Sequence, residues 1–260
     1  MVHTLAVANQ KGGVAKTTTV VSIGSAMAEH GLRTLLVDLD AQACLTFSLG
    51  IDPDEVEDGA HELLLGLSPA EKVVHRVSGD AGPGGTGVLD LIPATIELAG
   101  AESALLGRPG REFALRTALE PVIGGYDVVL LDCSPSLGVL TLAALTAADE
   151  VLIPMQCEML SHRGVGQLLD TIADVQRLLN PRLRVSGILP TMFDSRTSHG
   201  RAVLGDIADR YQLTVLSPPI PRTVRFTEAP AVGRSILQTA ANSPGAKAYR
   251  EVAAALRESW

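Results

Sequence analysis

The sequence predicts an α/β fold, in which helices cover both faces of a doubly wound, mostly parallel β-sheet. Three observations support this fold class. The chain has 260 residues and is 46% hydrophobic, enough to bury one large core. Short apolar runs containing β-branched residues alternate with helical patterns along the chain. No stretch rich in Pro, Gly and Ser divides it, so we expect a single domain over residues 1–260.

The alternation begins with a strand, a turn and a helix. Residues 2–8 form an apolar run that stops at a glycine-containing turn, which predicts a buried strand. Residues 17–29 predict a helix closed by Gly31, because glycine readily adopts the left-handed conformation that ends helices. Residues 34–37 predict a second buried strand, followed by Asp38-Leu39-Asp40.

The same alternation continues through the rest of the chain. Strands are expected at residues 126–132, 150–154 and 185–189. Helices are expected at residues 137–148, in the stretch before Asn180-Pro181, and near residues 197–211. Because strands separated by helices pair in parallel, this order predicts a parallel sheet covered on both faces.

Ligands of such sheets bind at the carboxyl ends of the strands. The residues that follow the predicted strands are 9–18, 38–42, 132–136, 154–158 and 190–194, and four of these five groups contain a carboxylate. Residues 52–81 carry no comparable signal. We interpret the sequence AGPGGTG at 81–87 as a mobile surface loop rather than a phosphate loop, since no helix start follows it.

A phosphate-binding loop is predicted by the sequence NQKGGVAKTTT at 9–19, between the first strand and the first helix. A helix N-terminus offers unpaired N–H groups to an anion, and Gly12 and Gly13 let the backbone approach it closely. Lys16 would reach the terminal phosphates of a nucleotide and the Thr17 hydroxyl would bind Mg²⁺. The usual pattern G-x-x-x-x-G-K-[ST] is not met, because Ala15 replaces its second glycine. We therefore expect an ordinary negative φ at Ala15.

Three carboxylates complete a predicted magnesium site. Asp132 ends the apolar run VVLLD, where it could hold a metal-bound water or simply cap the following helix. Together with Lys16 and Thr17 it forms a coherent Mg²⁺-triphosphate site. Asp38 and Asp40 face opposite ways if their strand continues, so one can approach the metal and the other an attacking water.

Composition excludes several other classes of protein. The N-terminus shows no signal sequence, and the longest uncharged run, residues 133–148, is too short to span a bilayer, so we expect a cytoplasmic protein. Cys44, Cys133 and Cys157 are far apart and form no C-x-x-C pair, which argues against a disulfide framework or a zinc ribbon.

Charge is distributed unevenly along the chain. Residues 1–181 carry a net charge of -13, whereas residues 182–260, with ten arginines and one lysine, carry +5; together they give the -8 of the chain. The basic C-terminal third could face a polyanion, or could equally be a solvated arginine-rich surface.

Six motifs in order resemble those of the ParA/Soj group of partition ATPases, within the deviant Walker A class of P-loop proteins. They are KGGVAKTTT at 11–19, DLDAQ at 38–42, LLDCSPSLG at 130–138, IPMQCE at 153–158, TMFDSRT at 191–197 and IPRTVRFTEAP at 220–230. LIPATIELAGAE at 91–102 also looks like a family segment. The resemblance covers nearly the whole chain except about residues 52–88.

The resemblance implies a role for each part of the site, with ATP and Mg²⁺ as cofactors. Lys11 is the signature lysine of the class and would reach the nucleotide of a partner subunit, so that two ATP molecules lie between two subunits. Asp40 would orient or activate the water, alongside Lys16 and Lys11 as catalytic residues. Asp132 would hold Mg²⁺ through water next to Thr17, with Asp38 supporting that shell. Glu158 is given a structural or switch role. Nucleotide contacts are assigned to Gly12, Gly13, Val14, Ala15, Lys16, Thr17, Thr18, Met192, Pro221 and Arg222.

The resemblance also implies an output. The ATP-bound homodimer would bind DNA without sequence preference and hydrolyse ATP slowly to drive chromosome or plasmid partitioning. A ParB-type centromere-binding partner would stimulate hydrolysis, and the ATP-bound protein would be nucleoid-associated. The candidate DNA contacts are Arg196, Arg201, Arg225, Arg234 and Arg250.

Three alternatives stay open. A MinD-like ATPase would need a C-terminal membrane anchor, and the last helical pattern, residues 246–260, does place its apolar residues on one face. That pattern is alanine-rich, so we expect it to pack on the core and expect no stable membrane association. A relative of the nitrogenase iron protein is not favoured by the cysteine pattern. An orphan ParA-like ATPase could position another cargo or a division component by the same mechanism.

Overall fold

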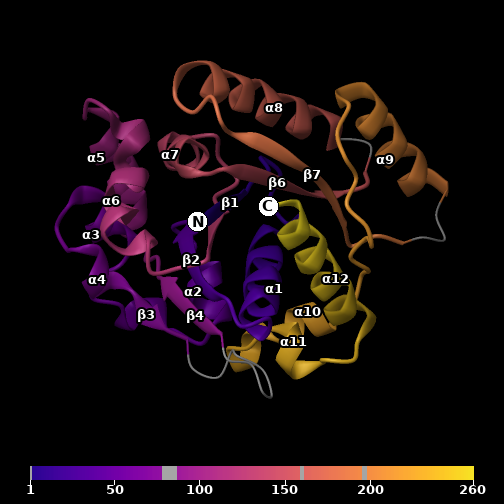
Figure 1. Ribbon diagram of the computed structural model, residues 1–260, viewed down its shortest axis with the longest axis horizontal. Helices are drawn as coiled ribbons and strands as arrows, with labels where there is room; N and C mark the ends of the chain where they lie inside the picture. The colour runs from indigo at the N-terminus through magenta and orange to yellow at the C-terminus, as the bar shows by residue number, and fades with distance from the viewer. Residues whose placement is uncertain (1, 78–86, 159–160, 195–197) are drawn as a thin grey trace.

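The computed structural model describes residues 2–77, 87–158, 161–194 and 198–260, without the side chains of residues 161–163, 198, 199 and 201. Its strands form one sheet in the order β3-β4-β2-β5-β1-β6-β7 (Figure 1). Every pairing is parallel except that of β3 with β4. The strands are β1 (His3–Val7), β2 (Arg33–Leu39), β3 (His75–Arg76), β4 (Val88–Ile92), β5 (Val128–Cys133), β6 (Glu150–Gln156) and β7 (Arg184–Thr191).

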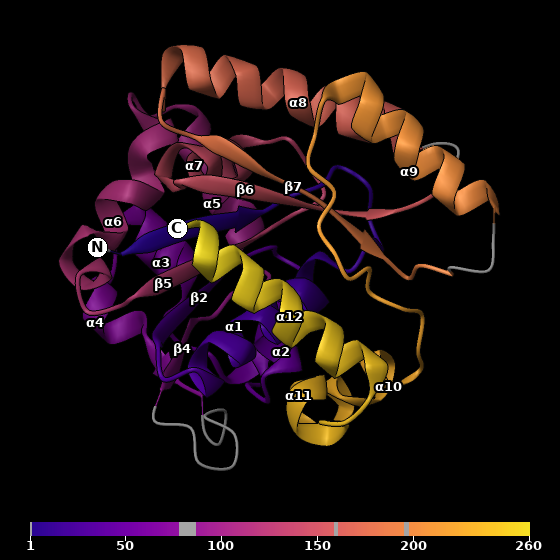
Figure 2. The same ribbon diagram turned by 45° about the vertical axis from the view of Figure 1, so that its right-hand side comes forward.

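Helices cover both faces of this sheet, as the sequence predicted (Figures 1 and 2). One face is covered by α1 (Lys16–Glu29), α2 (Cys44–Ser48), α11 (Ile236–Thr239) and α12 (Pro244–Ser259). The other is covered by α3 (Ala60–Leu65), α4 (Ala70–Val73), α5 (Leu98–Leu106), α6 (Ala114–Ile123), α7 (Val139–Ala147), α8 (Ser161–Leu178) and α9 (Ser198–Tyr211). The short α10 (Arg225–Glu228) precedes the single turn η3 (Pro230–Val232).

Alternate residues of each central strand face the two layers of helices. In β5, Val128 and Leu130 pack against the layer that contains α1, while Val129, Leu131 and Cys133 pack against the layer that contains α7. Burial on both sides explains why β5 is a continuous apolar run rather than an alternating one. Each such side chain contributes about 1.5–3 kcal/mol when fully buried. These central strands therefore form a rigid base for the residues that follow them.

The predicted elements are confirmed, but two strands were missed. The five expected strands and the helices at residues 17–29, 137–148 and 197–211 agree with the structure to within about two residues at most boundaries. Neither β3 nor β4 is predicted from the sequence, because β3 is two residues long and Asp90 interrupts the apolar run of β4. Asp90 is buried, where it accepts a hydrogen bond from the Tyr126 hydroxyl at 2.9 Å and pairs with Arg76. Of the predicted loop at 81–87, residues 81–86 lie outside the described part of the chain.

The C-terminal helix packs on the core, as expected. Tyr249, Val252, Ala253 and Leu256 of α12 are buried, and the Tyr249 hydroxyl lies 3.0 Å from that of Thr19 in α1. These apolar residues cover α1 and are not available to a bilayer. Among the described helices, none is both long enough and apolar enough to cross a membrane.

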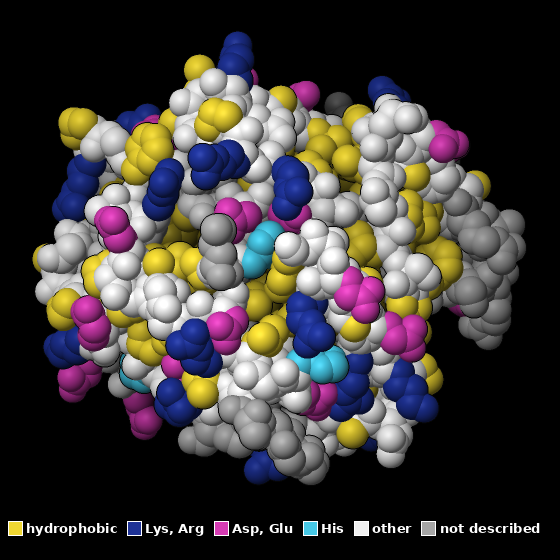
Figure 3. Space-filling view, in the orientation of Figure 1, with side chains coloured by type: hydrophobic (Ala, Val, Ile, Leu, Met, Phe, Trp, Pro, Cys, Tyr) yellow, Lys and Arg dark blue, Asp and Glu magenta, His cyan; other side chains and the backbone are white. Residues whose placement is uncertain are grey.

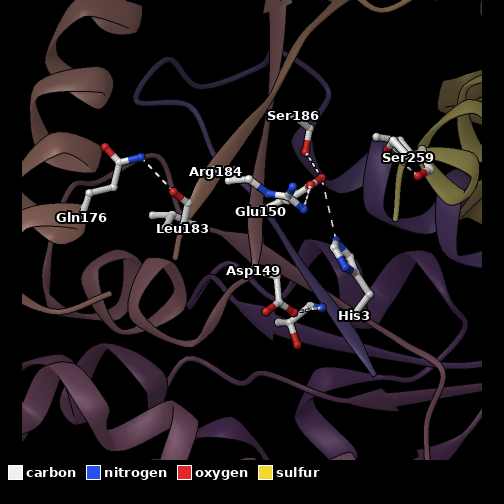
Figure 4. A network of polar contacts seen from close by, with 10 residues as sticks. His3, Asp149, Glu150, Gln176, Leu183, Arg184, Ser186 and Ser259 are labelled. Carbon is white, nitrogen blue, oxygen red and sulfur yellow. Dashed lines mark hydrogen bonds and ion pairs between the residues drawn. The ribbon is translucent and has the colours of Figure 1, made fainter. Parts of the chain in front are cut away.

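A polar network occupies the amino edge of the sheet (Figure 4). The Glu150 carboxylate pairs with the guanidinium of Arg184 at 2.7 Å, accepts a hydrogen bond from Ser186 at 2.7 Å, and lies 3.8 Å from the His3 ring. The C-terminal residue Trp260 stacks on His3 with ring centroids 4.2 Å apart. Burial is the main cause that lowers the pKa of His3. This edge therefore fastens the chain end to β1, and leaves the carboxyl edge for the site.

Candidate functional site

The loop between β1 and α1 has a left-handed turn directly before the helix. Gly13 has φ +73° and Ala15 has φ +66°. The prediction of a negative φ at Ala15 is wrong. The loop is fixed from outside, because the Val14 carbonyl accepts a hydrogen bond from the buried Thr191 hydroxyl at 3.0 Å and the Ala15 carbonyl accepts one from Thr19 N–H at 2.9 Å. These anchors outweigh alanine's own preference, at a cost of about 1–2 kcal/mol.

Space and positive charge lie together at this loop. A Cβ atom at Gly12 or Gly13 would meet no atom within 4 Å, so the backbone is open on that side. Lys16 is buried and its ammonium group donates to the Lys11 carbonyl at 3.2 Å. Burial lowers the pKa of Lys16, with Asp132 acting in the opposite direction. The loop thus offers N–H groups at a helix N-terminus and one ammonium to an anion.

Thr17 and Asp132 meet as the sequence predicted. The Thr17 hydroxyl donates to Asp132 Oδ2 at 2.7 Å, while Asp132 Oδ1 is buried with no hydrogen-bond partner among the described residues. Burial, and next the nearby Asp38, raise the pKa of Asp132 well above its usual range. An unpartnered buried carboxylate oxygen beside a hydroxyl is a donor set that suits Mg²⁺, which prefers oxygen ligands. The residues present therefore fit this metal.

Asp38 and Asp40 have different surroundings. Asp38 is buried near the end of β2. Its carboxylate accepts hydrogen bonds from the Thr46 N–H at 2.9 Å, from the Thr46 hydroxyl at 2.8 Å and from the Asp40 N–H at 3.2 Å. Burial raises the pKa of Asp38 to about 6. Asp40 follows the end of β2 and is only partly buried; its Oδ1 accepts from Gln42 N–H at 3.0 Å. Asp38 thus supports the turn from inside, whereas Asp40 is partly exposed and close enough to Lys16 and Asp132 to affect the pKa of each.

A cavity of about 320 Å³ adjoins the loop. Ala15 and Thr18 form one wall, and Met192, Pro221 and Arg222 line it from the ends of the C-terminal segments. The structure thus brings the three residues predicted to contact the base next to the phosphate loop. Met192 has φ +48°, and its sulfur lies 2.9 Å from Gln156 Nε2 at the end of β6. The cavity is mostly apolar, which suits the planar base of a nucleotide.

Lys11 does not point into its own phosphate loop. Its ammonium group pairs with the Glu158 carboxylate at 2.5 Å, two residues beyond the end of β6. Both side chains are partly exposed, Lys11 by 34% and Glu158 by 58%. Exposed ion pairs contribute about 0–1 kcal/mol, so this one can exchange for another anion.

The predicted DNA contacts differ in their surroundings. Arg225 is exposed and pairs with Glu228 at 2.8 Å, and Arg234 is also exposed. Arg250 instead donates to both oxygens of Glu29 and to the carbonyls of Leu237 and Ala241, so it fastens α12 to α1. Arg196 lies outside the described residues, as does the side chain of Arg201 in α9. On the face in Figure 3, Lys and Arg side chains are interspersed with Asp and Glu.

Residues important to the site were also missed. Asn9 and Thr191, both buried at strand ends, hold the loop in place through hydrogen bonds. Their position directly after or at the end of predicted strands was the available signal. Tyr249 of α12 lines the cavity of about 320 Å³, and no local sequence pattern indicates this.

Comparisons with known proteins show which proteins this chain resembles. Residues 2–185 match the family described as AAA domain. The chain is 46% identical to the chromosome-partitioning ATPase Soj of Thermus thermophilus, over 97% of this chain and 94% of that protein. It is 42% identical to the sporulation initiation inhibitor protein Soj of Bacillus subtilis, over 96% of each. A crystal structure named cobyrinic acid a,c-diamide synthase from Mycobacterium smegmatis, with bound ATP analog and magnesium, is 54% identical with a TM-score of 0.88, and covers 100% of this chain and 96% of that one.

Proposed function

The chain belongs to the ParA/Soj family of partition ATPases, and from that premise we propose that it is an ATP-dependent switch that dimerises around two nucleotides. The observation that carries the proposal is Lys11, whose ammonium group lies outside its own phosphate loop on an exchangeable surface carboxylate. The γ-phosphate of ATP bound to a second subunit would replace Glu158 as the ion-pair partner of Lys11. The nucleotide would then be shared by two subunits, and its hydrolysis would release them.

The nucleotide would lie along the loop, with its base in the 320 Å³ cavity. Backbone N–H groups of residues 12–18 and the Lys16 ammonium group would bind the phosphates. Thr17 and Asp132 would hold Mg²⁺, which neutralises charge on the phosphate oxygens. Asp132 Oδ1, buried and unpartnered among the described residues, supports this placement.

Hydrolysis would use Asp40 to orient the attacking water. The water oxygen bonds to the γ-phosphorus while the bond from that phosphorus to the bridging oxygen breaks, giving ADP and phosphate. Asp40 suits this role because it is partly exposed beside Lys16, whereas Asp38 is buried and accepts two hydrogen bonds from Thr46. Lys16, and Lys11 from the other subunit, would stabilise the transferred charge. Because a lysine, Lys11, rather than an arginine would be supplied by the second subunit, we expect slow turnover that a ParB-type partner stimulates.

The dimer would bind DNA through exposed arginines of the C-terminal third. Arg225 begins α10 and Arg234 lies two residues after η3. Val224, Phe226 and Thr227, next to Arg225, line the 320 Å³ cavity, so the placement of residues 225–234 can depend on the nucleotide. Binding through phosphates has no sequence preference. Such a protein would be nucleoid-associated when ATP is bound and could move a chromosome, a plasmid or another cargo.

One experiment tests site, dimer and output together. Gel filtration and DNA retention are measured with ATP, with ADP and without nucleotide, for the wild type and for Asp40→Ala. We expect a DNA-binding dimer only with ATP, and a longer-lived one for Asp40→Ala because hydrolysis is lost. Equal ATP turnover in Asp40→Ala would remove this residue from the catalytic role. If dimerisation and DNA binding are the same with ATP, with ADP and without nucleotide, the protein is not an ATP-dependent switch.

The name of the Mycobacterium smegmatis structure gives a second candidate, an ATP-dependent amide synthase. If ammonia came from glutamine, a reactive thiolate would be required. Burial raises the pKa of Cys133 to about 12 and that of Cys157 to about 11, and it also raises the pKa of Cys44. These thiols are poor nucleophiles at neutral pH. ATP hydrolysis without an acid acceptor, and no glutamate release from glutamine, would favour the switch.

The MinD-like alternative differs in its target surface. The apolar residues of α12 are buried against α1, which opposes a membrane role for that helix. Co-sedimentation with liposomes in the presence of ATP would favour it. An orphan ParA-like role is distinguished by the genome, since a neighbouring gene for a centromere-binding partner indicates partitioning.

A further inference from the structure

The side chain of Asn9 links the phosphate loop to the neighbouring strand. Asn9 follows β1 and is only 3% exposed. Its Nδ2 group donates to the Pro154 carbonyl of β6 at 2.7 Å, and its Oδ1 accepts from Lys11 N–H at 3.0 Å. One amide group therefore connects the backbone of a central strand to the backbone of Lys11.

The peptide unit of Lys11 is held by few other contacts. Its carbonyl accepts from Lys16 at 3.2 Å, and its side chain reaches Glu158. Gly12 and Gly13 follow, both exposed, with no side chain to pack. The direction in which the Lys11 side chain leaves the loop is thus set on one side by Asn9 and on the other by Lys16.

The Asn9 amide is also enclosed from behind. A Cβ atom at Gly164 of α8 would lie 3.6 Å from Asn9 Oδ1, which is ordinary van der Waals contact. With β6 on one side and α8 on another, the amide has little room to shift. A close-packed support of this kind fixes the group that it holds.

We propose that Asn9 is a positioning residue for Lys11, one that orients its backbone for contact with the partner subunit's nucleotide. The inference rests on the proposed function, because Lys11 acts there in trans. Nucleotide binding within one subunit depends on residues 12–18 and should survive without Asn9. The trans contact needs accurate placement, where an error of about 1 Å can cost about a hundredfold.

The test uses two substitutions in the full-length chain. Asn9→Ala removes both hydrogen bonds, whereas Asn9→Ser keeps an oxygen that can accept from Lys11 N–H in the local turn but is too short to tie it to Pro154. Light scattering measures the dissociation constant of the ATP-bound dimer. We expect this constant to be at least about tenfold higher for Asn9→Ala than for the wild type. Asn9→Ser should fall between them. The affinity for a fluorescent ADP analogue should change by less than about threefold.

A matched control is Asn180→Ala. Asn180 is another amide strut, whose Nδ2 donates to the carbonyls of Leu145 at 3.1 Å and Ala148 at 2.7 Å near the opposite edge of the sheet. Its loss should affect thermal stability and leave dimerisation unchanged. If Asn180→Ala weakens the dimer as much as Asn9→Ala does, the effect is general destabilisation and the inference is overturned.

A double-mutant cycle shows whether Asn9 acts through Lys11. Lys11→Ala and the double variant Asn9→Ala/Lys11→Ala should have the same dimerisation defect. An additional defect in the double variant would mean that Asn9 acts by another route, and an ADP affinity that falls in step with dimerisation would mean a merely structural role. If Lys11→Ala dimerises like the wild type, the proposed function itself fails; if only Asn9→Ala does, the inference alone fails.

Discussion

Ala15 shows a residue held in a conformation that its side chain disfavours. The sequence correctly identified the loop, but an intrinsic preference could not reveal a φ of +66°, which is imposed by Thr191 and by the first turn of α1. The Thr191 constraint comes from β7, 177 positions along the chain. Tertiary contacts of that range decide loop geometry and are not visible in a local motif.

A substitution at Ala15 tests this strain. Ala15→Gly removes a penalty of about 1–2 kcal/mol but increases the freedom of the unfolded chain by about 0.5–1 kcal/mol. We expect the free energy of unfolding to rise by up to about 1 kcal/mol, which is about 2–4 °C in Tm. Ala104→Gly, in the exposed middle of α5, is the control and should lose about 1 kcal/mol. A lower Tm for Ala15→Gly would contradict the assigned strain.

Asp132, the proposed Mg²⁺ ligand, is a residue whose buried charge lowers stability. Its carboxylate is buried beside Asp38, and its raised pKa means that the folded protein binds this proton more tightly than the unfolded chain does. The contribution of Asp132 to the free energy of unfolding therefore increases as the pH is lowered, and its ionised form destabilises the folded protein at neutral pH.

Asp132→Asn should accordingly stabilise the nucleotide-free protein at pH 7. We expect a gain of at least about 1 kcal/mol, or about 2–4 °C in Tm, that shrinks as the pH falls towards 4. The same variant should lose the increase in Tm that Mg–ADP gives the wild type. Thermal melts with and without Mg–ADP check both effects, and an unstable ligand-free Asp132→Asn would show that the carboxylate is structural.

At the scale of elements, Arg250 of α12 makes structural contacts that the sequence did not indicate. Arg250 was a candidate DNA contact, since charge alone cannot tell an exposed arginine from one that holds two helices together. The structure has it bonded to Glu29 of α1 and to the backbone before α12. The predicted apolar face of the same helix was confirmed, because helical periodicity is a local property that the sequence displays.

Arg250→Ala should therefore destabilise the fold. Losing several charge-assisted hydrogen bonds to a partly buried side chain costs about 1–3 kcal/mol. Arg257→Ala, at an exposed position of the same helix, should change stability by less than about 0.5 kcal/mol. Urea denaturation monitored by circular dichroism measures both. Equal stability of the two variants would contradict a structural role for Arg250 and would favour its role as a DNA contact.

The missed hairpin of β3 and β4 shows a second limit at this scale. Asp90 made the β4 segment look too polar for a buried strand, although Arg76 and Tyr126 compensate its charge and hydrogen-bonding capacity. Because Arg76 comes from β3 and Tyr126 lies just before β5, their contribution exists only after the sheet has formed.

At the scale of the whole molecule, the proposed DNA binding depends on exposed charges of each subunit, which a dimer would bring together. Arg225 and Arg234 are exposed at the two ends of the segment formed by residues 225–234, so a dimer would present four such guanidinium groups to DNA. Each phosphate contact contributes about -0.9 to the slope of log affinity against log salt concentration.

Substitution of either arginine should consequently change the salt dependence. In the ATP-bound dimer, Arg225→Ala or Arg234→Ala should make that slope shallower by about 2, since each change removes two contacts. Arg177→Ala, an exposed arginine of α8 paired with Asp174, should leave it unchanged. Fluorescence anisotropy with a DNA duplex between about 50 and 200 mM salt measures the slope. An unchanged slope in both variants would mean that Arg225 and Arg234 do not contact DNA phosphates and are simply solvated.

The central claim is that two subunits share each nucleotide through Lys11. It is tested most directly by light scattering of the wild type and of Lys11→Ala with ATP, with ADP and without nucleotide. The account predicts a dimer only for the wild type with ATP, while both proteins bind ADP with similar affinity. A Lys11→Ala protein that dimerises with ATP as the wild type does would contradict it.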